Sequence, residues 1–411
     1  MAPTGTNKHR VALVGTGHRG GGMWGKELID GWSDDVEMVA LCDINAQRMA
    51  GARQAMGTNA PMYTDFDTML REVKPQKVIV CTPDHTHDDF IVRALEAGVD
   101  VVTEKPMTTT AEKAKRILDA ERRTGRRVDV TFNYRYAPTA TRIKQLLLDK
   151  AIGEVTSVDF HWYLDTRHGA DYFRRWHAYA KNSGTLFVHK ATHHFDLLNW
   201  YLKSVPRQVT AHGALNVYGR NGPFRGPRCK ICPHKGECDF FLDIGKDPWL
   251  DMLYEAPSAE DGYVRDACVF REDIDIYDTM SAAILFENGV QASYSLNAAM
   301  PIEGYHLAFN GTKGRIEVRQ YEDQPWVEPP ADQILLIRNF KGVERIWIPT
   351  KKGGHFGGDD KLRDQLFRSD KGDPLEQRAG AEAGAMSLLT GVAAYTSVRE
   401  NRPVTLKSLL D

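Results

Sequence analysis

The sequence has almost no net charge and no long hydrophobic run. Its 53 Lys and Arg side chains nearly balance 55 Asp and Glu side chains, so the formal charge is -2. Such a balance provides no field for collecting polyanions, and we expect no nucleic-acid partner. No apolar run approaches the roughly 18 residues of a membrane span, and no basic segment precedes an apolar stretch at the start. These absences predict a cytoplasmic protein with no membrane partner.

Cysteine is also scarce, at six in 411 residues. Cys42 and Cys81 end apolar, strand-like runs and are expected to be inert core. The other four lie in a polar, Pro/Gly-rich stretch with the spacing C-x2-C-x5-C-x29-C: Cys229, Cys232, Cys238 and Cys268. In a reducing compartment this spacing favours a structural zinc site over disulfides, with an iron–sulfur cluster as a minor alternative. We therefore predict a metal-binding, Cys-rich insertion near residues 221–272.

The hydrophobic pattern divides the chain into two parts. Residues 9–132 alternate short apolar runs with helix-period segments, which predicts a parallel sheet covered on both faces. After about residue 135 the apolar residues alternate at a period closer to two, which favours antiparallel strands. We therefore expect an α/β protein with a Rossmann-like, parallel-sheet domain at 1–134 and an α+β domain at 135–411. The stretch at 351–360 is rich in glycine and is expected to be a loop.

A glycine-rich turn follows the first predicted strand. The residues Gly15-Thr16-Gly17-His18-Arg19-Gly20 form a G-x-G-x-x-G that opens the first helix. In this position the glycines allow a tight turn and close approach of the backbone to a pyrophosphate. Asp43, at the end of the next strand, matches the acid that binds the ribose hydroxyls. A carboxylate there disfavours a 2′-phosphate, so NAD is predicted over NADP, although nearby Arg48 weakens that preference slightly.

The stretch VHKATHHFD at 188–196 has three histidines and a lysine within nine residues. On a helix, His189, His193 and Asp196 would form one polar stripe, and Lys190 and His194 a second. The two-histidine zinc pattern needs a glutamate where Lys190 stands, which argues against a catalytic metal. Capping or core histidines are an alternative. We favour a face for proton transfer, because the first turn of a helix keeps imidazole neutral.

Four motifs together resemble the Gfo/Idh/MocA oxidoreductases over nearly the whole chain. They are Thr103-Glu104-Lys105-Pro106, the T-P-x-x-x-H of 82–87, Asn133-Tyr134-Arg135, and the H-x-x-D of 193–196. The resemblance implies a Rossmann domain beside a large, open, mainly antiparallel sheet, with a sugar or cyclitol bound between them. It also implies Lys105 as the catalytic lysine and His193 as the catalytic histidine. The sequence departs from the family pattern at His189 and Lys190, where an acid and a glycine are usual.

These patterns give three sets of candidate residues. The catalytic set is Lys105, His193, Lys190 and His189. The cofactor-binding set is Gly15, Gly17, His18, Arg19, Gly20, Asp43, Thr82, Pro83, His87, Glu104, Lys105 and Asn133. The substrate-binding set is Arg135, Tyr163, Trp176, His177, Lys190 and His194. Oxidation of a secondary alcohol needs a base for the hydroxyl proton and a cation for the developing alkoxide, and His193 and Lys105 can divide these roles.

The leading hypothesis is an NAD-dependent oxidoreductase that moves hydride between nicotinamide and a secondary hydroxyl of a sugar or cyclitol. One alternative is an NAD-dependent glycosidase or eliminase that works through a transient keto-sugar, with Lys190 or His189 as base. Another is a non-enzymatic, sugar-sensing regulator. A cluster of cations, namely Arg167, His168, Arg174 and Lys190, raises the hypothesis of an acidic sugar. An open sheet also makes a homo-oligomer plausible.

Overall fold

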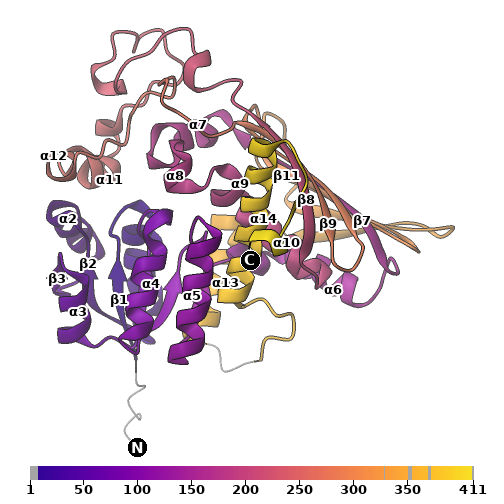
Figure 1. Ribbon diagram of the computed structural model, residues 1–411, viewed down its shortest axis with the longest axis horizontal. Coiled ribbons are helices and arrows are strands. Elements are labelled where there is room, and N and C mark those ends of the chain that lie inside the picture. The colour runs from indigo at the N-terminus through magenta and orange to yellow at the C-terminus, as the bar shows by residue number, and fades with distance from the viewer. Residues whose placement is uncertain (1–7, 328, 350–353, 369–371, 410–411) are drawn as a thin grey trace, which may run out of the picture.

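A seven-stranded sheet and a nine-stranded sheet organise the chain (Figure 1). The computed structural model describes residues 8–327, 329–349, 354–368 and 372–409. The long helix α14 (Ala381–Glu400) lies between the two sheets and contacts elements of both halves. Among the described residues, no helix has both the length and the apolar composition needed to cross a membrane.

The first sheet has the strand order β15-β6-β5-β4-β1-β2-β3. Its six N-terminal strands are parallel, and β15 joins the edge strand β6 in antiparallel fashion. The strand bounds are β1 His9–Val14, β2 Val36–Cys42, β3 Met62–Tyr63, β4 Lys77–Val80, β5 Asp100–Thr103, β6 Val128–Val130 and β15 Ala379–Gly380. The central strands are buried on both faces, since apolar clusters lie on each side of them. This burial explains their continuous hydrophobic runs.

Helices connect these strands, and polar caps set several of their ends. Asn45 and Thr110 each accept a hydrogen bond from a backbone N–H of the first turn that follows, as helix starts require. Gly125 ends its helix in the left-handed conformation, at φ 65°. The helical elements are η1 Gly20–Lys26, α1 Glu27–Trp32, α2 Ala46–Met56, α3 Phe66–Val73, η2 Asp84–Thr86, α4 His87–Glu96, α5 Ala111–Thr124, η3 Asn133–Tyr136 and α6 Pro138–Leu148.

The parallel arrangement brings the ends of distant strands together. The glycine turn follows β1, Asp43 follows β2, and Thr82 follows β4 within two residues. Lys105 comes two residues after β5, and Asn133 follows β6 closely. Because the carboxyl ends of parallel strands lie at one edge, these segments share the edge at which open α/β sheets bind ligands.

The second sheet has the order β14-β13-β12-β11-β7-β10-β9-β8-β16. Every neighbouring pair is antiparallel except β7 with β10. The predicted fold class, a Rossmann domain followed by a large and mainly antiparallel sheet, is confirmed. The bounds are β7 Val155–Asp165, β8 Pro206–Ala214, β9 Thr279–Phe286, β10 Gln291–Met300, β11 Glu303–Gly311, β12 Gly314–Asp323, β13 Ala331–Arg338, β14 Gly342–Pro349 and β16 Val404–Thr405.

One face of the second sheet packs on helices and forms the largest apolar core. The helical elements of this half are α7 Thr166–Arg174, η4 Trp176–Ala178, α8 Ala180–Ser183, α9 Leu186–His189, α10 Ala191–Leu202, α13 Gly354–Phe367 and η9 Lys407–Leu409. The stretch 188–196 therefore covers the end of α9 and the start of α10, which meet at Lys190, instead of one continuous helix. Part of the predicted loop at 351–360 belongs to α13, which begins at Gly354. Residues 355–357 of α13 have left-handed backbone angles. Residues 351–353 lie outside the described residues.

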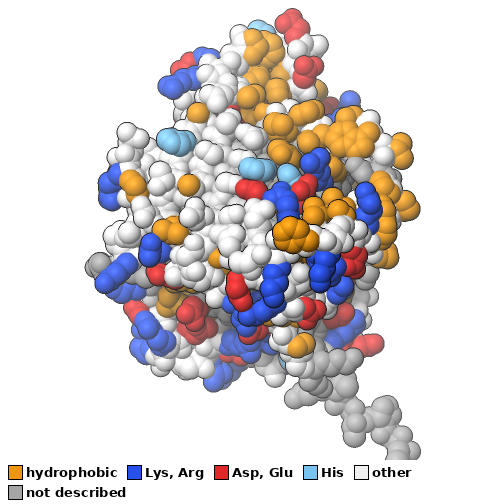
Figure 2. Space-filling model, turned by 90° about the vertical axis from the view of Figure 1, so that its right-hand side faces the viewer, with side chains coloured by type: hydrophobic (Ala, Val, Ile, Leu, Met, Phe, Trp, Pro, Cys, Tyr) orange, Lys and Arg blue, Asp and Glu red, His pale blue; other side chains and the backbone are white. Residues whose placement is uncertain are grey.

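The opposite face of the second sheet is open. Along β9 and β10, buried residues alternate with exposed ones such as Ser281 and Ser293, as expected for a sheet covered on one side. Figure 2 turns the right-hand side of Figure 1 toward the viewer and shows charged and histidine side chains near its centre. Arg315 of β12 pairs with Asp159 of β7 across this face. The pattern explains the period of two in this half of the sequence.

A long insertion interrupts this sheet between β8 and β9. Its regular structure consists of short helical turns: η5 Gly219–Asn221, η6 Cys229–Ile231, η7 Ile244–Lys246, α11 Pro248–Leu250, η8 Asp251–Glu255 and α12 Ser258–Asp261. Figure 1 shows that α11 and α12 lie beside α2 of the first domain. The insertion therefore reaches from the second domain back to the first.

Candidate active site

The glycine turn has the shape that a dinucleotide cradle needs. Gly15 has φ 87°, and a Cβ there would lie 2.6 Å from the carbonyl oxygen of Cys81. A Cβ on Gly20 would lie 1.9 Å from the oxygen of Gly15. At Gly17 the nearest atom is the hydroxyl of Tyr254, 3.1 Å away. Gly15 and Gly20 thus permit the tight turn, and the missing side chain at Gly17 lets the hydroxyl of Tyr254 lie against it.

Asp43 lies directly beside this turn. Its Oδ2 accepts hydrogen bonds from the backbone N–H and the hydroxyl of Thr16, at 2.7 and 2.9 Å. Its Oδ1 accepts from the backbone N–H of Asn45. The carboxylate is thereby fixed between the glycine turn and the start of α2, which is where a ribose acid belongs.

Residues of the T-P-x-x-x-H motif hold the loop after β4 in place. The ring nitrogens of His87 lie 2.9 and 2.8 Å from the carbonyl oxygens of Pro106 and Thr82. The hydroxyl of Thr86 donates to the hydroxyl of Thr82, and Pro83 begins the short turn η2. His87 is buried, and through these two contacts it joins the loops after β4 and β5. Because both ring nitrogens already face protein carbonyls, neither is free to bind a cofactor.

A charged network links the glycine turn to the loop after β5. Arg19 donates through Nε to Glu104 at 2.7 Å, and the indole N–H of Trp24 donates to the same carboxylate oxygen. Burial would raise the pKa of Glu104, but the charge of Arg19 and the bond from Trp24 keep it below its ordinary value. Asn133 donates to Asp359 of α13 at 2.5 Å. The network fixes Glu104, the residue directly before Lys105.

Lys105 lies partly buried where the loop after β5 meets the end of α9. Its Nζ donates to the carbonyl oxygen of His189 at 3.1 Å. Burial lowers the pKa of Lys105 to about 8; the charge of Asp84 raises it, and that of Lys190 lowers it further. An amine with this pKa can serve either as a cation for a developing alkoxide or as a proton carrier near neutral pH.

His189 forms a short contact with Asp84, a residue that the sequence patterns did not single out. The Nδ1 of His189 and the Oδ2 of Asp84 are 2.5 Å apart, and both side chains are buried. Burial raises the pKa of Asp84, which the charge of Lys105 opposes. Burial also lowers the pKa of His189, and Lys105 lowers it further. The two side chains share this short contact, so Asp84 orients the ring of His189.

His193 is the residue with unused proton-binding capacity. Neither of its ring nitrogens has a hydrogen-bond partner among the described residues, although the side chain is buried. Its ring packs edge-on against Tyr134, with centroids 4.7 Å apart. Burial, followed by the charge of Lys105, holds the pKa of His193 well below its ordinary value. Since a buried polar group without a partner is costly, these nitrogens are suited to receive a ligand hydroxyl.

Lys190 and His194 line the sheet side of this region. The ammonium of Lys190 lies 5.0 Å from the ring centre of Trp162. Burial lowers the pKa of Lys190, while Glu303 and Glu322 raise it. His194 stacks on Trp162 at 4.2 Å, and its Nδ1 is 2.7 Å from the hydroxyl of Tyr294. His194 thus belongs to the apolar core, whereas Lys190 has the carboxyl groups of Glu303 and Glu322 in its electrostatic surroundings.

The structure corrects two predicted substrate contacts. The guanidinium of Arg135 is bound to both oxygens of buried Asp196, at 2.6 and 2.7 Å, and to the carbonyl of Glu376. Tyr163 follows Trp162 on β7, so its side chain points to the other, open face of the sheet, away from Lys190. Arg135 therefore has a structural ion pair, and Tyr163 is not near the other candidates.

The remaining predicted contacts lie close to His189. His177 is buried, stacks on Trp176 at 3.6 Å, and has its ring centre 4.2 Å from that of His189. Burial, then the charge of His189, lowers the pKa of His177 well below its ordinary value. The rings of Trp176 and His177 thus pack beside His189, the residue that contacts Asp84 and Lys105.

Besides Asp84, sequence reasoning missed residues that come from distant parts of the chain. His355 and Asp359 of α13 lie beside Tyr134 and Asn133, and Glu303 pairs with His168 at 3.1 Å. Asp84 could have been found, since it directly follows the Thr-Pro of a recognised motif. The others carry no local pattern, because only the tertiary fold brings them near.

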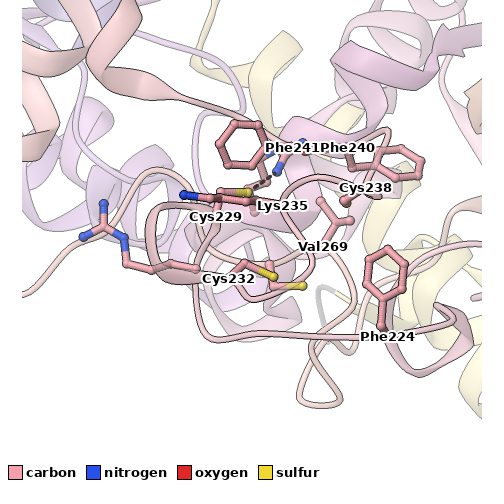
Figure 3. A pocket seen from close by; sticks show the side chains of 11 residues that line it. Phe224, Cys229, Cys232, Lys235, Cys238, Phe240, Phe241 and Val269 are labelled. Carbon is pink, nitrogen blue, oxygen red and sulfur yellow. Dashed lines mark hydrogen bonds between the residues drawn. The ribbon is translucent and has the colours of Figure 1, made fainter.

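The predicted zinc site is not supported by the structure. Among the described residues, no group of three or more His, Cys, Asp or Glu side chains is arranged to hold a metal ion. Cys229, Cys232, Cys238 and Cys268 are free thiols that line one cavity of about 20 Å³ (Figure 3). Arg174 approaches within 3.5 Å of the sulfur of Cys229. The cysteines are gathered as expected, but they contact neighbouring side chains and do not form a ligand set.

Comparisons with known proteins agree with this geometry. Residues 9–132 match the oxidoreductase family with an NAD-binding Rossmann fold, and residues 144–406 match its C-terminal alpha/beta domain. The chain is 39% identical to YteT of Bacillus subtilis (strain 168), over 97% of this chain and 98% of that protein. It is also 31% identical to the D-glucoside 3-dehydrogenase of Escherichia coli (strain K12), over 36% of this chain and 41% of that protein.

Among solved structures, the WlbA dehydrogenase of Bordetella pertussis, in complex with NADH and UDP-GlcNAcA, has a similar fold. It gives a TM-score of 0.66 at 21% identity and covers 97% of this chain and 99% of that chain. These matches define the class as a two-domain oxidoreductase with a Rossmann fold. The chain belongs to the Gfo/Idh/MocA oxidoreductase family.

Proposed function

We propose that the protein is an NAD-dependent dehydrogenase that oxidises a secondary hydroxyl of a sugar or cyclitol. The observation that supports this most directly is the buried ring of His193. Neither of its nitrogens has a hydrogen-bond partner in the described part of the chain, and the charge of Lys105 acts on the ring. A neutral base and a nearby cation are the two groups that alcohol oxidation requires.

The residues present fit a dinucleotide. Gly15 and Gly20 form the tight turn, Asp43 is fixed beside it, and the first helix starts directly behind it. When bound, NAD would supply the hydride acceptor. Arg19 and Glu104, which bind each other, would set the distance between the phosphate end and Lys105. Thr82, Pro83 and Asn133 remain proposed as cofactor contacts on the strength of their place at the same sheet edge.

The proton chemistry follows from the two domains. In the proposed reaction a ring nitrogen of His193 accepts the hydroxyl proton, because burial keeps that ring neutral. The ammonium of Lys105 polarises the same oxygen and stabilises negative charge as it develops. His189 stays fixed by Asp84, and its backbone carbonyl holds Lys105 in position.

A carbohydrate substrate is supported by the relatives. Their names include D-glucoside 3-dehydrogenase and inositol 2-dehydrogenase. The cation cluster that suggested an acidic sugar is dispersed in the structure: Arg174 faces Cys229, and Arg167 is exposed at the start of α7. Lys190 is accompanied by Glu303 and Glu322. We therefore propose a neutral sugar as the preferred substrate, and equal or faster turnover of a uronate would contradict this.

One observation favours a second candidate, the glycosidase or eliminase that works through a transient keto-sugar. The pair of His189 and Asp84 is an additional acid–base group beside Lys105. Such a group could remove the proton next to a newly formed carbonyl. The two functions differ in products, because a dehydrogenase accumulates NADH whereas the second candidate releases an aglycone without net NADH.

The test is a screen of purified protein with NAD against inositols, free sugars, uronates and aryl glycosides, followed by NADH absorbance and aglycone release. His193→Ala is expected to lower kcat by about 10²–10⁴-fold, the usual value for a general base, with little change in NAD binding. Lys105→Ala is expected to lower kcat similarly. The matched control is Lys26→Ala, which changes an exposed lysine and should leave kcat unchanged. Full turnover by His193→Ala would remove the assignment. Binding of NAD and sugar without turnover would favour the regulator.

We also infer that the protein forms a homo-oligomer through the open face of the second sheet. This face carries small, polar and charged side chains over a broad area, and an open face of this kind can pair with a second copy. Sedimentation of the purified protein tests the inference, and a monomer at micromolar concentration would contradict it.

A further inference from the structure

A segment of the insertion, residues 247–263, lies on the dinucleotide turn. The hydroxyl of Tyr254 accepts the backbone N–H of His18 at 2.7 Å. The indole of Trp249 donates to Nδ1 of His18 at 2.9 Å. These contacts join residues more than 230 positions apart, and Figure 1 shows α11 and α12 against the first domain near α2. The segment therefore covers the first βα turn from the side of the second domain.

The same segment occupies the start of α2. The carboxylate of Glu260 accepts two backbone N–H groups, those of Ala46 at 2.8 Å and Gln47 at 3.0 Å. The amide of Asn45 donates to the carbonyl of Pro257 at 2.8 Å. Unpaired N–H groups at the start of a helix attract anions. In this protein a carboxylate from the other domain already fills that position on the eleven-residue helix α2.

The cation beside the ribose acid is also neutralised by the segment. Arg48 lies 3.6 Å from Asp43. Its Nη2 donates to Asp261 at 2.6 Å, and its Nε donates to the carbonyl oxygen of Leu253. An arginine near the ribose acid would otherwise accommodate a 2′-phosphate. Because Arg48 binds Leu253 and Asp261 of the insertion, its guanidinium is not free to bind a 2′-phosphate.

We propose that residues 247–263 complete the adenosine end of the dinucleotide site and make it select NAD against NADP. The inference rests on the proposed dinucleotide function and names the groups that decide its specificity. A 2′-phosphate at the end of β2 would meet three carboxylates, those of Asp43, Glu260 and Asp261, and would find both the helix N–H groups and Arg48 already paired. The unphosphorylated ribose avoids this repulsion and needs only Asp43.

The test measures dissociation constants of NAD and NADP directly, by calorimetry, for the full-length protein. Wild type is expected to bind NAD at least about 100-fold more tightly than NADP. Glu260→Lys frees the start of α2 and adds a cation, so the NAD-to-NADP ratio of affinities should fall by on the order of tenfold or more. Asp261→Asn releases Arg48 and should move the ratio in the same direction. Glu272→Gln, an exposed carboxylate of the same insertion, is the control that should leave the ratio unchanged.

The outcomes separate this inference from the proposed function. A ratio in Glu260→Lys and Asp261→Asn within twofold of wild type would overturn it, as would equal weakening of both cofactors. Wild type that binds NAD and NADP equally would also overturn it while leaving the dehydrogenase proposal intact. Wild type that binds neither dinucleotide would instead remove the proposed function. Thermal unfolding of each variant, followed by circular dichroism, distinguishes loss of the fold from loss of selection.

Discussion

Replacing Asp84 with Asn should change the pH dependence of the proposed reaction. The pKa of Lys105 is lowered to about 8, chiefly by burial, and the charge of Asp84 is the main influence that raises it. Asparagine keeps the shape of the side chain and removes that charge. The pKa of Lys105 should therefore fall further, because burial and Lys190 then act with less opposition.

The size of the shift can be bounded. A nearby opposite charge moves a pKa by about 1–3 units, and Glu104, which also raises the pKa of Lys105, remains in the variant. We expect a fall of about one unit, equivalent to about 1.4 kcal/mol. With a pKa of about 8 the lysine is roughly nine-tenths protonated at pH 7, and with a pKa lowered by one unit it is about half protonated.

The assay is the pH dependence of kcat/KM at saturating NAD. Because the ammonium is the form that polarises the oxygen, activity should be lost as pH rises through the pKa of Lys105, near pH 8 in wild type. In Asp84→Asn this limb should move to about pH 7, by the shift worked out above. On the acid side activity should persist below pH 6.5, since the pKa of His193 is held well below that value.

Two variants serve as controls for this prediction. Asp89→Asn removes a half-exposed carboxylate of the adjacent helix α4 that pairs with Arg93, and should leave both limbs in place. His189→Gln removes the ring that Asp84 orients but retains the charge of Asp84, so its alkaline limb should stay near that of wild type. An alkaline limb in Asp84→Asn that is unmoved, or that moves to higher pH, would refute the reasoning.

Two further predictions concern the cradle and the domain contact. Gly20→Ala places a Cβ 1.9 Å from the oxygen of Gly15, so NAD binding measured by equilibrium dialysis should be lost. In the control Gly22→Ala the nearest atom to the new Cβ is 4.0 Å away, and this variant should bind NAD normally. Equal binding of NAD by both variants would contradict the assignment. Arg135→Met leaves the buried carboxylate of Asp196 unpaired, which should lower the free energy of unfolding by about 3–5 kcal/mol in a urea titration. Unchanged stability with a raised KM would instead restore Arg135 to the substrate site.

The glycine turn and Lys105 could be predicted because their signals are local. A G-x-G-x-x-G has meaning only after a strand and before a helix, and the strand β1 and the helix that follows were both readable from periodicity. The same holds for Lys105, which a parallel strand delivers to the ligand edge of its sheet. His193 was found through its motif, whereas its unpaired nitrogens became visible only in the fold.

The errors have a common physical origin. Tyr163 was expected at the substrate, but strand alternation alone does not say which face of β7 meets the helices. Arg135 was expected to contact the substrate, but its guanidinium binds Asp196, which lies on another element. The spacing of the cysteines matched a zinc site, yet spacing along the chain does not fix the directions of the sulfur atoms. In each case the missing information was the orientation of a side chain relative to a distant partner.

The sequence by itself determined the two-domain architecture, the glycine turn, the place of Lys105 at the ligand edge of the first sheet, and the family. These features follow from hydrophobic period, glycine placement and short motifs, which act over a few residues. Only the tertiary structure decided that Asp84 orients His189, that Arg135 pairs with Asp196, and that Glu260 fills the start of α2. Such contacts join residues 61 to 214 positions apart, and their energies depend on burial and mutual orientation, which no local pattern encodes.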